Sequence, residues 1–157
     1  MRYDFGCVAR HEMSKLASIT AKELKPSQIV LLYGQLGSGK TTFVSEMAED
    51  LGIEKGRVRS PSFSLINIYK GHSLVYHVDL YRLEDFDTEI IMELEEIIER
   101  KDGILVVEWA DRFEGFWSKD CLKIFFDFCE NGRIVQMESK DDLVERIVSR
   151  WLNGKKI

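Results

Sequence analysis

An eight-residue glycine-rich segment constrains this chain more than any other part of its sequence. Residues 34–41 read Gly-Gln-Leu-Gly-Ser-Gly-Lys-Thr and match the pattern G-x-x-x-x-G-K-[ST] in full. The apolar run Ile29–Tyr33 before it is typical of a strand buried on both faces of a parallel sheet, and an apolar stripe from Phe43 to Leu51 after it indicates an amphipathic helix. A strand, a turn and a helix in this order are the context that makes the match to a phosphate-binding loop specific.

The residues of this loop suit the binding of a nucleotide phosphate chain. Glycines let the backbone wrap a phosphate so that successive N–H groups converge on its oxygens, and the helix that begins near Gly39 adds its positive end. Lys40 is expected to reach the β and γ phosphates, and the Thr41 hydroxyl to be a ligand of Mg²⁺. A glycine-rich turn that binds nothing is the alternative. The candidate nucleotide-binding residues of this segment are Gly34, Leu36, Gly37, Ser38, Gly39, Lys40, Thr41 and Thr42.

Two acidic residues stand at the ends of predicted strands. Asp79 follows Leu74–Val78 and Glu108 follows Ile104–Val107, so parallel strands would deliver both side chains to the carboxyl edge of the sheet, where ligands bind. Glu108 fits the pattern of a metal-holding carboxylate, and Asp79 is a candidate to orient water or to bind the metal through water. His77 is interpreted as structural support beside Asp79. The alternative for each acid is a helix cap or a solvent-facing side chain.

A short polar stretch, Arg59–Phe63, lies between the helix after the loop and the strand at Leu74. Its position suits a switch loop, in which a serine hydroxyl could meet Mg²⁺ or the γ phosphate and order the segment only in the triphosphate state. The same residues are equally compatible with a plain loop.

The order of the predicted elements indicates an α/β fold. Alternation of strands and helices predicts a P-loop NTPase-like three-layer domain with a central, mostly parallel sheet, and the Asn131-Gly132 turn predicts an antiparallel C-terminal hairpin. We expect residues 1–157 to form a single domain, because a typical domain takes roughly 100–200 residues. Besides the elements around the loop, we predict a helix over Glu12–Leu24, a strand over Leu74–Val78, a helical stripe over Ile90–Ile98, a strand over Ile104–Val107, hairpin strands over Leu122–Phe128 and Arg133–Met137, and a helix over Asp141–Leu152.

The charge of the chain is concentrated in one segment. The formal net charge of −5 argues against general affinity for nucleic acid, because such binding depends on lysines and arginines that neutralise phosphates. Between Glu84 and Asp102 there are nine acidic and two basic residues, a net of −7, so the rest of the chain sums to +2. The simplest interpretation is the solvated outer face of the predicted helix.

Three cysteines, an odd number, fit reduced thiols better than disulfides. Cys121 and Cys129 lie in what reads as one strand, so we expect no disulfide. The N-terminus lacks the apolar stretch of a signal peptide and no run approaches the roughly 18 apolar residues of a membrane span, so we expect a cytoplasmic protein.

Three further blocks carry a resemblance to a known family. Residues 60–63, 76–83 and 107–109 read Ser-Pro-Ser-Phe, Tyr-His-Val-Asp-Leu-Tyr-Arg-Leu and Val-Glu-Trp. With the phosphate loop, and in this order, they resemble the TsaE family of small bacterial ATPases of the tRNA threonylcarbamoyladenosine pathway. The block His-x-Asp-x-Tyr-Arg-Leu is the most discriminating of them.

The resemblance implies a protein that binds ATP with Mg²⁺, hydrolyses it slowly and acts with the TsaB and TsaD proteins. Those partners carry the threonylcarbamoyl transfer, so this chain would meet tRNA only indirectly. By the matching motifs, Lys40 and Thr41 serve the phosphates and the metal, Glu108 serves the metal, Asp79 serves hydrolysis, and Trp109 lies close to the nucleotide.

The chain departs from the family pattern in places. Ser62 stands where the family commonly has threonine. Serine keeps the hydroxyl but loses the methyl group that restricts the side-chain rotamer. The N-terminal helix reads His11–Ser14 where the family usually offers a threonine, so the base contact is unassigned. Arg133 resembles a family position near the nucleotide and could equally be a solvated hairpin residue.

Three other functions fit a phosphate loop. A small-molecule kinase would usually bring an arginine-bearing lid, and no comparable insertion is found in the sequence. A GTP-binding switch would usually have the guanine-reading motif Asn-Lys-x-Asp, which the sequence lacks. A nucleotide-binding module without turnover differs from an ATPase only in hydrolysis.

Overall fold

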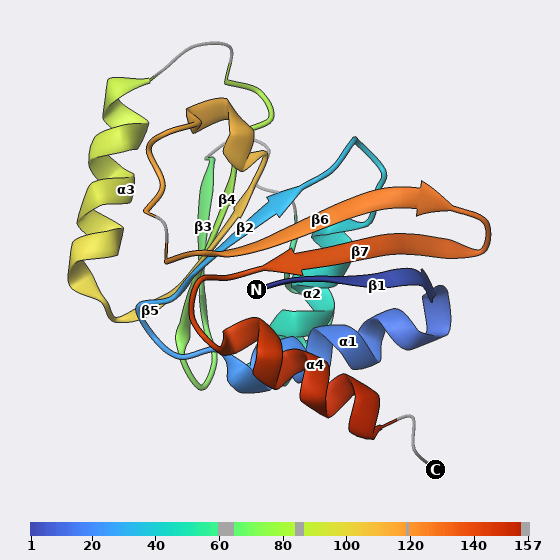
Figure 1. The fold of residues 1–157 in the computed structure, drawn as a ribbon. Helices are drawn as coiled ribbons and strands as arrows, with labels where there is room; N and C mark the ends of the chain where they lie inside the picture. Colours follow the sequence, from blue (N-terminus) through green and yellow to red (C-terminus); the bar gives the residue numbers. More distant parts are fainter. Residues whose placement is uncertain (60–64, 84–86, 119, 155–157) are drawn as a thin grey trace.

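The computed structural model describes residues 1–59, 65–83, 87–118 and 120–154, and a seven-stranded mixed sheet lies at the centre of this part of the chain (Figure 1). The strands are β1 (Arg2–Ala9), β2 (Ile29–Tyr33), β3 (Ile66–Lys70), β4 (Leu74–Asp79), β5 (Gly103–Glu108), β6 (Leu122–Cys129) and β7 (Gly132–Glu138). Their order across the sheet is β1-β7-β6-β2-β5-β4-β3.

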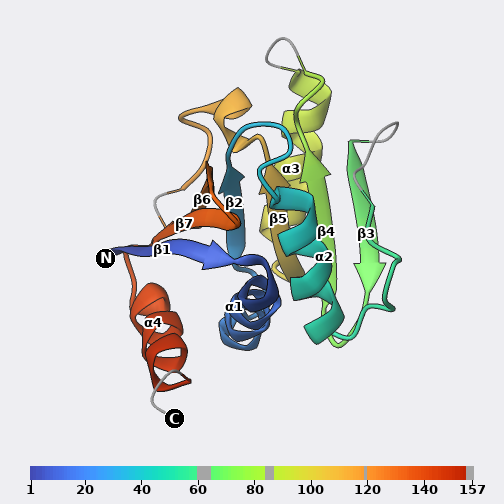
Figure 2. The same ribbon diagram turned by 90° about the vertical axis from the view of Figure 1, so that its right-hand side faces the viewer.

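Helices cover both faces of this sheet. They are α1 (Arg10–Glu23), α2 (Lys40–Asp50), α3 (Thr88–Arg100), α4 (Leu143–Asn153) and the short 3₁₀ helix η1 (Ala110–Phe113). Helices α1, α2 and α4 lie on one side and α3 on the other, as Figures 1 and 2 show from two directions. The predicted three-layer α/β fold is therefore confirmed. Across the described ranges, no helix is long and apolar enough to cross a membrane.

Strand β2 shows why the fold has a hydrophobic core on each side of the sheet. Successive side chains of a strand point to opposite faces. Val30 and Leu32 pack in the core beneath α1, α2 and α4, whereas Ile29 and Leu31 pack in the core beneath α3. Burial on both faces explains why this strand is an unbroken apolar run.

The middle of the sheet is parallel and its margins are antiparallel. Strand β2 pairs in parallel with β5 and β6, and β5 pairs in parallel with β4. The hairpin of β6 and β7, the edge strand β1 and the edge strand β3 add antiparallel pairs. This confirms the predicted parallel centre and the predicted C-terminal hairpin. It also brings the carboxyl ends of β2, β5 and β4 to one edge.

Helix α3 follows its amphipathic pattern. The apolar side chains Ile91, Leu94 and Ile97 are buried against the sheet. Asp87 caps its N-terminus by accepting hydrogen bonds from two backbone N–H groups of the first turn. The glutamates opposite the apolar stripe are exposed, as predicted for a solvated face; they are Glu89, Glu93, Glu96 and Glu99.

Strands β1 and β3 do not appear among the predicted elements, and β1 has a clear physical reason. Tyr3 and Phe5 alternate with exposed residues, but the register with β7 shifts between Asp4 and Cys7. An extra residue in a strand reverses the phase of the alternation. Val8, three positions after Phe5, is therefore the buried residue, and the segment shows no strict period of two.

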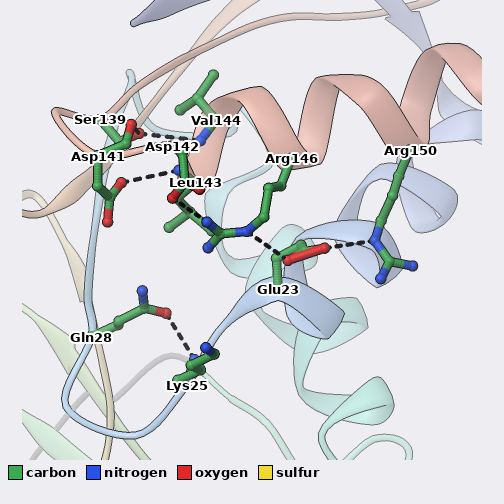
Figure 3. A network of polar contacts seen from close by, with 10 residues as sticks. All are labelled: Glu23, Lys25, Gln28, Ser139, Asp141, Asp142, Leu143, Val144, Arg146 and Arg150. Atoms are coloured by element: carbon green, nitrogen blue, oxygen red, sulfur yellow. Dashed lines mark hydrogen bonds and ion pairs between the residues drawn. The ribbon is translucent and has the colours of Figure 1, made fainter.

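Helix α4 is fastened to α1 by a forked ion pair (Figure 3). The two carboxylate oxygens of Glu23 accept hydrogen bonds from Arg146 Nε at 3.0 Å and from Arg150 Nε at 2.6 Å. Burial acts to raise the pKa of Glu23, but the hydrogen bonds from Arg150 and Arg146 outweigh it and lower that pKa. The pair thus ties the C-terminal helix to the first one.

A disulfide joins Cys7 of β1 to Cys129 of β6, with 6.1 Å between their Cα atoms. The expectation of reduced thiols is wrong for these two residues. Both cysteines flank β7, since Cys7 lies opposite Ile134 and Cys129 opposite Gly132. The 122 positions between them hide this proximity in the sequence. Cys121 is a free thiol, and burial raises its pKa.

Replacing Cys7 and Cys129 by serine is expected to lower the free energy of unfolding by about 2–4 kcal/mol, because the bridge restricts the unfolded chain across a long loop. Urea denaturation with and without a reductant measures this. The reductant should lower the midpoint of the wild-type protein and leave the double variant unchanged. Equal midpoints for the oxidised wild-type protein and the variant would contradict the prediction.

Candidate functional site

The glycine-rich segment connects β2 to α2 through a tight turn. Gly39 is the N-cap residue of α2 and has a φ of +99°, which residues with a Cβ rarely adopt. At Gly34 the space is closed, because an added Cβ would lie 2.5 Å from Ser38 Oγ and 2.9 Å from the carbonyl oxygen of Phe126. Close packing and backbone conformation thus require these glycines and hold the loop at the head of the helix.

Lys40, the first residue of α2, folds back over the loop. Its ammonium donates hydrogen bonds to the carbonyl oxygens of Gly34 and of Gln35, the latter at 3.1 Å. It also lies 4.1 Å from the centroid of the Trp109 ring, within the range of a cation–π contact. The loop carbonyls and one aromatic face therefore hold the ammonium beside the turn.

Two carboxylates lie at the carboxyl edge of the sheet. Glu108 ends β5 and Asp79 ends β4, and the two residues are opposite each other in register. Thr41 Oγ1 donates a hydrogen bond to Glu108 Oε1 at 2.8 Å. Asp79 Oδ1 accepts a hydrogen bond from the backbone N–H of Tyr81 at 3.0 Å. The strand ends predicted from the sequence therefore meet beside the phosphate-loop motif.

The charges of this edge act on one another. Burial lowers the pKa of Lys40, and the carboxylates of Glu108, Asp79 and Asp111 oppose that shift without cancelling it. An anion bound in the loop would add negative charge beside the ammonium and favour its charged form. The site is thus electrostatically suited to a phosphate group.

Glu108 has a second partner behind the site. Its Oε2 lies 2.6 Å from Nε2 of His77, and both side chains are almost completely buried, at 0% exposure for His77 and 3% for Glu108. In the described part of the chain, His77 Nδ1 has no hydrogen-bond partner. The histidine therefore supports Glu108, whereas the sequence suggests only its neighbourhood to Asp79.

A cavity of about 840 Å³ opens over the loop and the two strand ends. Its volume falls within the range of roughly 300–1,000 Å³ that is common for sites of small molecules and cofactors. The predicted residues that line it are Leu36, Gly37, Gly39, Lys40, Thr41, Thr42, Asp79, Glu108, Trp109 and Arg133.

Comparisons with known proteins identify the family of this chain. The family model described as "Threonylcarbamoyl adenosine biosynthesis protein TsaE" matches residues 7–135. The chain belongs to the TsaE family. It is 45% identical over 101 residues to the tRNA threonylcarbamoyladenosine biosynthesis protein TsaE of Aquifex aeolicus, covering 62% of this chain and 69% of that protein. To the protein of the same name from Bacillus subtilis it is 39% identical over 114 residues, covering 72% of this chain and 70% of that one.

A solved structure extends the similarity to the fold. The chain superposes on the crystal structure of Bacillus subtilis YdiB with a TM-score of 0.78 and 27% sequence identity, covering 99% of this chain and 97% of that one. The α/β fold is therefore shared with a solved structure.

Of the remaining predicted residues of this TsaE family member, some line the cavity and others do not. Gly34 and Ser38 are absent from its lining, and Ser38 is buried, with no hydrogen-bond partner for its hydroxyl among the described residues. Arg133 lines the cavity, and its Nη2 donates to the carbonyl oxygen of Gly37 at 3.2 Å. Arg133 thus borders the cavity from the hairpin of β6 and β7, and its contact with a nucleotide stays a prediction. Ser62 lies outside the described residues.

Trp109 has an unusual backbone conformation for its residue type. Its φ is +59°, in the left-handed region that non-glycine residues rarely adopt. The ring lies 4.9 Å from that of Tyr81, and the guanidinium of Arg112 is 5.7 Å from its centroid. Such strained residues persist where their surroundings hold them, and they cluster at functional sites.

Part of the cavity has no counterpart in the sequence prediction. Strand β1 and the start of α1 border it, as do the turn between β6 and β7 and a glutamate on α2. Glu46 lies four residues after the predicted Thr42 on α2, so the two residues share a face of the helix. Helical periodicity would therefore have indicated Glu46. No such signal exists for β1. The cavity-lining residues that sequence reasoning did not select are Val8, Arg10, Met13, Glu46, Tyr81, Arg82, Asn131 and Gly132.

Substitutions of His77 and Glu108 by leucine are expected to be coupled in their effect on stability. Either change alone leaves a buried polar partner unsatisfied, at a cost of about 1–3 kcal/mol. The double variant removes both groups and should cost less than the sum of the single variants, by about 0.5–3 kcal/mol. Urea denaturation of the four proteins measures this coupling.

The exposed His72 provides a matched control, because it lies outside the cavity lining. His72→Leu combined with Glu108→Leu should give additive changes. Additive changes for His77 and Glu108 would show that their contact contributes nothing to stability.

Proposed function

We propose that this TsaE family member binds ATP with Mg²⁺, hydrolyses it slowly, and acts as an accessory protein in tRNA threonylcarbamoyladenosine biosynthesis. The biosynthetic role is supported by the family description and by the names of the relatives. The ATP chemistry is supported chiefly by one observation, the hydrogen bond at 2.8 Å between Thr41 in the phosphate-loop motif and Glu108 at the adjacent strand end.

The donor set of this site fits Mg²⁺. Mg²⁺ prefers oxygen ligands and is usually bound through one or two protein groups together with substrate phosphates and water. Thr41 and Glu108 offer a hydroxyl and a carboxylate already in contact. In the ranges that the structure describes, no group of three or more His, Cys, Asp or Glu side chains could form an all-protein metal cage. When bound with a nucleotide, Mg²⁺ neutralises charge on the phosphates.

In this proposal, each side chain of the site has its own role in ATP binding or hydrolysis. Lys40 exchanges its contacts with loop carbonyls for the phosphates, a stronger charge-assisted interaction. Thr41 and Glu108 hold the metal, and His77 keeps the Glu108 carboxylate in place. Asp79 orients the attacking water from the neighbouring strand end. Ser62 contributes a hydroxyl to Mg²⁺ or to the γ phosphate.

The TsaB and TsaD proteins are the proposed partners. In this proposal they carry out the transfer to tRNA, and the nucleotide state of this chain controls their activity. The net charge of −5 supports indirect contact with tRNA, since direct binding would need a surplus of basic residues.

The proposed role is tested by measuring ATP hydrolysis and tRNA threonylcarbamoyladenosine formation with the pure protein and then with TsaB and TsaD added. Hydrolysis should be weak alone, and modification of tRNA should require all three proteins. A preference for guanine nucleotides, or rapid phosphoryl transfer to a metabolite, would count against the proposal.

Lys40→Ala is expected to weaken binding of ATP by about 1–3 kcal/mol, because the change removes a charge-assisted contact with the phosphates. Isothermal titration calorimetry with ATP and Mg²⁺ measures the loss. Lys70→Ala, on the exposed side of β3, is the matched control and should bind as the wild-type protein does. Unchanged affinity of Lys40→Ala would refute the assignment of the site.

Asp79→Asn is expected to reduce ATP hydrolysis on the order of a hundredfold while binding changes little, because a side chain that positions water acts mainly in the transition state. Phosphate release and calorimetric binding are compared on the same preparation. Asp127→Asn, at an exposed position of β6, serves as the control. Equal losses of binding and hydrolysis would assign Asp79 to nucleotide binding instead.

A further inference from the structure

The cavity continues beyond the phosphate-loop motif, and its far part has no role in the proposed function so far. Lys40 and Thr41 border it at the start of α2, and Glu46 borders it further along the same helix. Val8 of β1 and Met13 of α1 add apolar walls to the same cavity. A ligand that places its phosphates on the loop would therefore extend its remaining part toward Glu46.

The position of Glu46 on α2 follows from helix geometry. Six residues separate it from Lys40, which corresponds to about 9 Å along the helix axis. Residues four apart share a face of a helix, so Glu46 lies in line with Thr42 and Asp50. Asp50 accepts a hydrogen bond from Ser18 of α1 at 2.5 Å. Glu46 thus stands on the side of α2 that meets α1, between this contact and the phosphate-loop motif.

One carboxylate oxygen of Glu46 is buried and makes no hydrogen bond within the described residues. Its Oε2 is inaccessible to solvent and has no hydrogen-bond partner among the residues that the structure describes. Burial, followed by the neighbouring charge of Glu49, raises the pKa of Glu46. A buried polar group costs free energy unless it is hydrogen-bonded, and an ionised carboxylate can only accept hydrogen bonds. The missing partner of the ionised carboxylate is therefore a hydrogen-bond donor, and a donor in the cavity reaches Oε2 once the Glu46 side chain turns toward it.

We propose that Glu46 contacts the nucleoside part of the bound nucleotide and accepts a hydrogen bond from it. This inference rests on the proposed nucleotide binding. The donor is either the exocyclic amino group of adenine or a ribose hydroxyl, and both are N–H or O–H groups that a carboxylate accepts. The apolar walls of Val8 and Met13 suit a flat base beside a polar anchor, which is the usual composition of a small-molecule site.

Calorimetric titration of the full chain with ADP and three analogues tests the assignment. The analogues are 2′-deoxy-ADP, 3′-deoxy-ADP and purine riboside diphosphate, which lacks the amino group of adenine. The wild-type protein should bind the analogue without the contacted donor on the order of tenfold to a hundredfold more weakly than ADP. The analogue that loses affinity identifies the donor as base or ribose.

Glu46→Ala should weaken ADP binding by the same factor and bind ADP and that analogue equally. Glu46→Gln keeps the shape with a neutral acceptor and should lie between the wild-type protein and Glu46→Ala. Glu95→Gln, at an exposed position of α3 and outside the cavity lining, is the matched control and should keep both affinities. Urea denaturation confirms that each variant is folded; removal of an unpartnered buried carboxylate should not lower stability near neutral pH.

Two results would overturn the assignment. A wild-type protein that discriminates among the nucleotides, with Glu46→Ala preserving the same ratio, would place the contact on another residue. Unchanged ADP affinity in Glu46→Ala would show that the carboxylate does not touch the ligand. In both cases nucleotide binding itself would stand. A wild-type protein that binds neither ADP nor ATP would instead overturn the proposed function, and the role of Glu46 with it.

Discussion

The parallel register of β2, β5 and β4 is the constraint on which the rest of the site depends. Leu32 of β2 lies opposite Glu108 of β5, and Glu108 lies opposite Asp79 of β4. Parallel strands end on the same side, so the loop that follows β2 meets both carboxylates. A slip of one residue would turn these side chains to the other face of the sheet. The hydrophobic cores on both faces oppose such a slip, since each strand buries alternate residues in each.

Lys40 and Glu108 at this edge are buried, and their contacts explain how the fold tolerates them. Removing a charge from water is costly unless it is paired and hydrogen-bonded. Glu108 accepts a hydrogen bond from Thr41 and contacts His77, while loop carbonyls and the Trp109 ring hold Lys40. The same exclusion of water strengthens any electrostatic contact with a phosphate. A site of this kind is therefore held in shape before a ligand arrives.

The two ends of the cavity come from different parts of the fold. The parallel centre of the sheet forms the end at the phosphate-loop motif, whereas the far end is bordered by the antiparallel edge strand β1, by α1 and by the turn between β6 and β7. The disulfide of Cys7 and Cys129 joins β1 to β6 beside that turn. The wall around the proposed nucleoside end thus depends on the antiparallel margin of the sheet, and a covalent bridge reinforces this margin.

Local patterns in the sequence determined the strand–loop–helix unit around residues 34–41, the parallel centre, the hairpin at Asn131-Gly132 and the strand-end positions of Asp79 and Glu108. These features depend on residues close in the chain, through period, turn chemistry and glycine. Only the tertiary structure decided the disulfide, the contact of His77 with Glu108 and the presence of Glu46 in the cavity. Each of these features depends on the packing of segments that are far apart in the chain. In β1, the bulge between Asp4 and Cys7 interrupts the alternation that would have indicated a strand.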